Sequence, residues 1–96
     1  MSKLKKRSVV VEAITFDELV EYGISHGANV HDGMPWSFEY QGRPITHENN
    51  DCYLIPSRMV ELGTVRFNRG DMLITNEDGE IFPCRADVFR ETYEPA

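Results

Sequence analysis

The strictest pattern in this chain is an alternation of aromatic and polar residues: Trp36, Ser37, Phe38, Glu39 and Tyr40. Because successive side chains of a strand point to opposite faces, this order predicts a strand with three rings on one face. We expect that aromatic face to pack in the core. The alternative is a base-stacking platform, but such platforms are rimmed with basic residues and only Arg43 lies nearby.

Short apolar segments separated by turn residues predict further strands. We expect them over residues 8–14, 43–47, 52–55, 64–67, 72–75 and 80–84. The first should be central in its sheet because it is rich in β-branched residues. Pro44 lacks a backbone donor and argues for an edge strand. Gly79 can adopt the positive φ that a hairpin turn over residues 76–79 requires.

Two segments predict helices. Thr15 and Glu18 form a capping box at the start of the first helix, and Gly27 is the expected stop. Its apolar residues at helical spacing should face inward: Phe16, Leu19, Val20 and Ile24. A short C-terminal helix should turn another set inward: Val88, Phe89, Thr92 and Tyr93. Residues 28–35 and 57–63 read as loops.

These elements predict an α+β fold with a small, mainly antiparallel sheet, one helix after the first strand and a short C-terminal helix. The chain of 96 residues has the size of one domain. Four of the ten basic residues lie between Lys3 and Arg7, so residues 8–96 carry six basic and sixteen acidic side chains, a net charge of −10. We therefore expect a disordered basic arm over residues 1–7 and a single domain over residues 8–96.

The charge of residues 8–96 disfavours nucleic acid as a partner and favours basic proteins. No apolar run approaches the roughly 20 residues of a membrane span, and the start of the chain lacks the apolar stretch of a secretory signal. We expect no membrane association and a cytoplasmic location. Cys52 and Cys84 should be reduced, partly buried thiols.

The densest polar cluster covers residues 46–52 and includes His47, Glu48 and Cys52. We interpret it as an asparagine-rich turn rather than a metal site or a cysteine nucleophile, because its spacing does not make His47 and Cys52 converge. His26 and His31 flank an irregular segment and should be solvated or contact a ligand. The sequence predicts no catalytic residues, no metal and no cofactor.

The C-terminal third carries a recognisable series of motifs: Arg69-Gly70-Asp71-Met72-Leu73-Ile74-Thr75, Gly79-Glu80-Ile81-Phe82-Pro83-Cys84, Asp87-Val88-Phe89 and Tyr93-Glu94-Pro95. This series resembles a group of small uncharacterised phage and prophage proteins. The opening at residues 11–16 and the segment 46–55 are similar to the same group. The chain departs from the pattern at Arg85, where lysine is usual, and at residues 76–78. The resemblance implies a phage origin but no activity, and we interpret the shared residues as structural, with a small anion near Gly70 and Asp71 or at the start of the final helix as the alternative.

Three functions remain as hypotheses. The first is a non-enzymatic accessory protein that engages a host protein, for instance to antagonise a host defence. The second is a nucleotide-binding sponge, and the third is a minor virion component; either could be a homo-oligomer. The candidate binding residues are Trp36, His26, His31, Arg43, His47, Glu48, Arg69 and Asp71.

Overall fold

The structure is a computed structural model that describes residues 2–6, 9–57 and 63–95. Within these residues the order of elements is β1 (Ser2–Lys6), β2 (Val9–Thr15), α1 (Phe16–Ser25), β3 (Val30–His31), β4 (Met34–Pro35), β5 (Ser37–Tyr40), β6 (Arg43–Asn49), β7 (Cys52–Pro56), β8 (Thr64–Asn68), β9 (Met72–Thr75), β10 (Ile81–Cys84), α2 (Ala86–Thr92) and β11 (Glu94–Pro95). Two helices among mostly antiparallel strands confirm the predicted α+β class. Neither described helix is long and apolar enough to cross a membrane.

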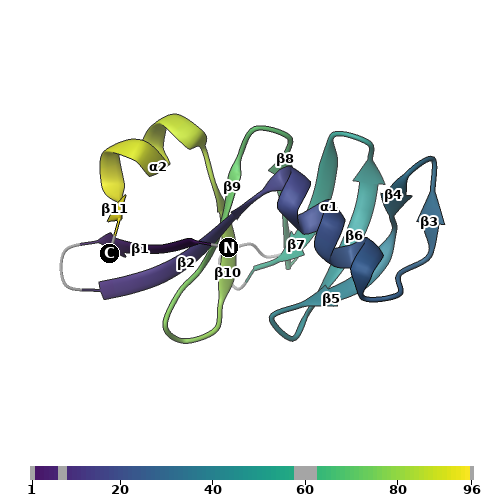
Figure 1. The fold of residues 1–96 in the computed structure, drawn as a ribbon, viewed down its shortest axis with the longest axis horizontal. Helices are drawn as coiled ribbons and strands as arrows, with labels where there is room; N and C mark the ends of the chain where they lie inside the picture. Colours follow the sequence, from purple (N-terminus) through teal and green to yellow (C-terminus); the bar gives the residue numbers. More distant parts are fainter. Residues whose placement is uncertain (1, 7–8, 58–62, 96) are drawn as a thin grey trace.

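The strands among the described residues form three sheets rather than the one expected from the sequence. A five-stranded sheet has the order β10-β9-β2-β1-β11, a four-stranded sheet has the order β5-β6-β7-β8, and β3 pairs with β4 alone. Figure 1 shows the five-stranded sheet beside α2 at one end of the molecule and the β3–β4 hairpin at the other. As predicted, β2 lies in the middle of its sheet, between β9 and β1.

The five-stranded sheet separates two apolar clusters. On one face, Ile14 and Leu73 join the side chains of α1 and the four-stranded sheet, including the fully buried Tyr53. On the other face, Ala13 and Ile74 pack with residues of α2. The adjacent residues Ala13 and Ile14 of β2 thus pack in different clusters, because successive side chains of a strand point to opposite faces.

The start of α1 follows the sequence prediction closely. The Thr15 hydroxyl accepts a hydrogen bond from the Glu18 N–H at 3.1 Å, and the Glu18 carboxylate accepts one from the Thr15 N–H at 2.9 Å. This capping box satisfies two backbone donors that a helix start leaves without helical partners. The hydrogen bond from the Thr15 N–H to the carboxylate stabilises its charged form and lowers the pKa of Glu18.

The predicted disordered arm is wrong for residues 2–6. These residues form β1, which pairs with β2 from Ser2↔Ala13 to Lys6↔Val9. Composition alone predicted a solvated tail. The free edge of β2, however, offers backbone N–H and C=O groups, and a charged segment can pair with these groups as well as an apolar one can. Residues 1 and 7 of the predicted arm lie outside the described residues.

The expectation that Pro44 marks an edge strand is also wrong. The strand β6 lies between β5 and β7. Its pairing with β7 begins at Thr46↔Leu54, so Pro44 lies beyond that pairing and faces Glu39 of β5 on its other side. A proline is tolerated there because no ladder hydrogen bond to β7 is lost.

Residues 28–35 were expected as a loop, but they contain the β3–β4 hairpin. Asp32 and Gly33 both have positive φ, 53° and 77°, as a two-residue type I′ turn requires. Two inward-facing predictions also fail, since Ile24 is 45% exposed and Val88 is 46% exposed. Of the expected loop over residues 57–63, the positions 58–62 lie outside the described residues.

Candidate functional site

The β3–β4 hairpin positions the tryptophan that follows it. Met34 and Pro35 of β4 are buried, and β4 pairs with β3 through Val30↔Pro35 and His31↔Met34. The Trp36 N–H donates to the Asn29 carbonyl at 2.9 Å, and the Trp36 carbonyl accepts from the His47 N–H at 3.0 Å. The backbone of Trp36 is therefore fixed from both sides.

The side chain of Trp36 is not in the core, contrary to the sequence prediction. Its exposed fraction is 44%, whereas Tyr40 at the other end of the same alternation is 2% exposed and Phe38 is half-buried. The alternation therefore predicted the common face correctly, but that face extends beyond the edge of the core. Sequence periodicity does not show where the covering layer ends.

Two histidine rings flank the Trp36 indole. The His47 ring lies nearly parallel to it, with centroids 4.8 Å apart and an interplanar angle of 9°, and the His31 ring is tilted at 4.5 Å. A His47 ring nitrogen, Nε2, lies 3.1 Å from Asn50 Oδ1. One indole face is thus already stacked on a ring of the protein itself, which leaves less of it for a nucleic acid base.

Tyr53 connects this cluster to the core. Its ring meets the His47 ring edge-on at 5.6 Å, and its hydroxyl donates to the Pro35 carbonyl at 2.5 Å. Burial raises the pKa of Tyr53 to about 12, so the phenol remains a hydrogen-bond donor at neutral pH. The cluster therefore packs against a fully buried residue of β7.

Large apolar side chains are exposed around the same hairpin. The exposed fractions of Ile24, Val30 and Trp36 lie between 44% and 46%. Their elements meet at Pro35: Val30 pairs with it, Trp36 follows it, and a Cβ on Gly23, next to Ile24, would approach its ring to 2.8 Å. We call the three contacting rings of His31, Trp36 and His47 the Trp36 surface. The hairpin that positions these rings has a signal in the sequence, because the Asp32-Gly33 dipeptide favours a two-residue turn.

Arg69 and Asp71, two other predicted site residues, lie elsewhere and make structural contacts. The Arg69 guanidinium bonds the Asp51 and Asp17 carboxylates at 2.9 and 3.1 Å. It also donates to the Asn50 carbonyl at 2.7 Å and lies 4.6 Å from the centre of the Phe16 ring. Asp71 accepts a hydrogen bond from the Asn68 N–H in its own turn. A depression of about 290 Å³ lies beside them, and the arginine that lines it, Arg69, is already paired with carboxylates.

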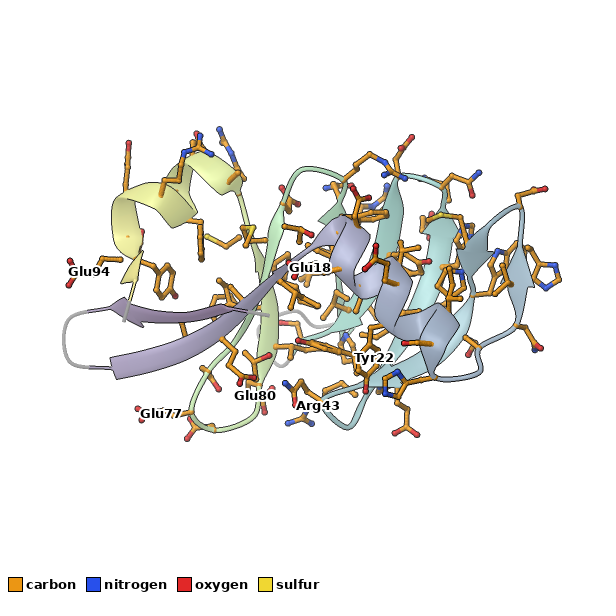
Figure 2. All side chains as sticks on the ribbon, in the orientation of Figure 1. Glu18, Tyr22, Arg43, Glu77, Glu80 and Glu94 are labelled. Atoms are coloured by element: carbon orange, nitrogen blue, oxygen red, sulfur yellow. The ribbon has the colours of Figure 1, made fainter. Side chains whose placement is uncertain are left out.

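The remaining predicted residues are also dispersed. Arg43 pairs with Glu80 at 3.0 Å, between the β5–β6 hairpin and the β9–β10 turn (Figure 2). Glu48 lies 3.8 Å from the Arg66 guanidinium. His26 stacks on Tyr22 at 3.9 Å, and its Nδ1 lies 2.8 Å from the Tyr22 carbonyl at the end of α1. Of the eight predicted residues, the structure brings together His31, Trp36 and His47.

The described titratable side chains include no group of three or more that could hold a metal ion. Cys52 and Cys84 are free thiols, the first buried and the second partly buried. Burial raises the pKa of Cys52, so its thiol stays protonated at neutral pH. Comparison of the chain with protein-family models, curated proteins and solved structures finds no match.

Proposed function

We propose that this chain is a phage-encoded accessory protein that binds a host protein inside the bacterial cell and has no catalytic activity of its own. The observation that carries the proposal is the Trp36 surface. Tryptophan is among the residues that contribute most to protein interfaces, and here the indole is 44% exposed between two histidine rings. Its fixed backbone and the buried Tyr53 beneath it limit the entropy lost on binding.

The charge of the chain supports a partner with a basic surface. The net charge is −6, and the exposed Asp32 lies at the tip of the hairpin that carries Val30 and His31. Opposite charge on the partner would speed encounter and fix orientation, while the Trp36 indole supplies affinity. We therefore expect association to slow as ionic strength rises.

The phage origin rests on the motifs of the C-terminal third. They resemble a group of phage and prophage proteins, and a small acidic phage protein with an exposed binding surface is suited to antagonise a host defence protein. The structural role assigned to these motifs agrees with their positions, since Gly70 and Gly79 adopt positive φ in turns and Phe89 and Tyr93 pack in the second core.

A nucleotide sponge is the weaker hypothesis because the described arginines best placed for phosphate already pair with carboxylates. Arg43, Arg66 and Arg69 each have a carboxylate oxygen within 4 Å. Binding a phosphate would require those pairs to break. No contact of the described residues favours a virion component over an accessory protein.

Photo-crosslinking in bacterial cells tests the proposal. A benzoylphenylalanine placed at Val30, next to His31 on the β3–β4 hairpin, should form a covalent adduct with one host protein, whereas the same group at Val88, an equally exposed position on α2, should not. Adducts of equal yield at both positions, or none at Val30, would contradict the proposal.

A further inference from the structure

The outer edge of β5 has backbone groups that no other described strand pairs. The four-stranded sheet has the order β5-β6-β7-β8, so β5 is an edge strand. It contains no proline or bulge, two of the features by which edge strands resist pairing, and its one charged side chain is Glu39, which would favour a basic partner strand.

The register of the β5–β6 hairpin shows which groups face outward. Gln41 and Gly42 both have positive φ, and Tyr40↔Arg43 closes the two-residue turn. In such a hairpin the residue pair that closes the turn is hydrogen-bonded, and so is every second pair beyond it. The backbone of Phe38 therefore bonds to β6. The hydrogen bond from the His47 N–H to the Trp36 carbonyl continues this alternation. The N–H and C=O groups of Ser37 and Glu39 consequently point away from β6.

A groove runs along the same residues. It has a volume of about 340 Å³ and is bounded on one side by β5 and on the other by the last turn of α1: Tyr22, His26, Gly27, Ala28, Ser37, Phe38 and Glu39. Figure 1 shows β5 and the end of α1 at the same side of the molecule. An added strand would lie roughly 4.8 Å from β5, with alternate side chains toward the groove.

We propose that the edge of β5 binds an extended, basic segment of a partner protein as an added strand. This inference rests on the proposed function and specifies the form of the partner. Ser37 and Glu39 would each exchange main-chain hydrogen bonds with the segment, which is the way peptides add to a sheet edge. The Glu39 carboxylate, exposed on β5 of an acidic chain, favours lysine or arginine at the position opposite. Two copies of this chain would instead bring two acidic molecules together.

Selection from a surface-displayed library of random twelve-residue peptides tests the proposal. The full chain should enrich peptides with alternating basic and apolar residues. Glu39→Pro should weaken their binding at least ten-fold, because proline removes the outward N–H and blocks strand addition, yet spares the pairs that bond to β6. Glu39→Gln should weaken it only a few-fold, since it removes the charge alone.

A second measurement on the wild-type chain does not depend on how the proline variant folds. Adding the strongest selected peptide should slow amide hydrogen exchange at Ser37 and Glu39 at least ten-fold. Failure to enrich any peptide, equal binding to Glu39→Pro, or unchanged exchange at both amides would overturn the proposal. Self-association that Glu39→Pro abolishes would overturn it too, because the occupant would then be a second copy. If only Trp36 variants, and not Glu39→Pro, lose binding of the peptides, the proposed function would still hold and only the role of β5 would be refuted.

Discussion

The Tyr53 hydroxyl donates a hydrogen bond of 2.5 Å to the Pro35 carbonyl, and this bond joins the inner strand β7 to the hairpin that carries the Trp36 surface. Both residues are fully buried, so the carbonyl has no water to replace the phenol. The contact links stability to the proposed function. A change at Tyr53 should therefore affect both the free energy of unfolding and the order of residues 30–36.

Tyr53→Phe removes only the hydroxyl and leaves the Pro35 carbonyl without its donor. We expect the free energy of unfolding to fall by about 1–3 kcal/mol, the usual cost of a buried unsatisfied group. Urea denaturation measures this loss. Amide hydrogen exchange should quicken at residues 30–36, and unchanged exchange there would refute the link between Tyr53 and the hairpin.

Stability should also fall at alkaline pH because of the same residue. Burial raises the pKa of Tyr53 to about 12, whereas a tyrosine in an unfolded chain titrates near 10. The contribution of Tyr53 to the free energy of unfolding is constant below about pH 10. It is lost as the pH rises toward 12, because the tyrosine of the unfolded chain releases its phenol proton at a lower pH than that of the folded chain. Across that window we expect a loss of about 2 kcal/mol relative to Tyr53→Phe, measured by denaturation at each pH. Parallel pH profiles for the two proteins would contradict this assignment.

Arg69 is expected to stabilise the junction between α1 and the β7–β8 sheet. Arg69→Met removes the ion pairs to Asp17 and Asp51 and should lower the free energy of unfolding by about 1 kcal/mol, a modest figure because the side chain is half exposed. The matched control is Arg66→Met, whose nearest carboxylate oxygen is 3.8 Å away. It should change stability by less than about 0.5 kcal/mol. Equal losses in thermal denaturation would show that the Arg69 contacts contribute nothing specific.

Gly23 allows α1 to lie close to the β3–β4 hairpin. A Cβ at this position would lie 2.8 Å from the Pro35 ring and 3.0 Å from the Phe38 ring. Alanine normally stabilises a helix interior by about 1 kcal/mol relative to glycine, but here we expect Gly23→Ala to destabilise by about 1–3 kcal/mol. Glu21→Ala, at an exposed position of α1, is the control and should have little effect. A gain in melting temperature for Gly23→Ala would contradict the close approach.

Local features of the fold were predictable from the sequence, and the assembly of sheets was not. The Thr15 capping box and the turn before Gly79 each depend on residues within four positions of one another, so local chemistry determines them. By contrast, the placement of β2 beside β9, as in Glu12↔Thr75, and of β1 beside β11, as in Leu4↔Pro95, depends on pairing between distant segments. Residue type does not specify such partners, because every backbone offers the same donors and acceptors.

The candidate site was predictable only in part for the same reason. Trp36, His31 and His47 were singled out by their chemistry, but their stacking depends on a hairpin that the sequence analysis interpreted as a loop. Ile24 was expected in the core because it follows the helical spacing of Leu19 and Val20. It is 45% exposed, because periodicity within a single helix does not show which of its turns the rest of the fold covers.

Affinity capture from bacterial lysate tests the central claim, that the Trp36 surface binds a protein, most directly. Wild-type chain and Val88→Ser should retain the same host protein in stoichiometric amount, while Trp36→Ala should bind the purified partner at least ten-fold more weakly at unchanged stability. Equal affinity of Trp36→Ala and wild type for that partner, or the absence of any stoichiometric partner, would contradict it.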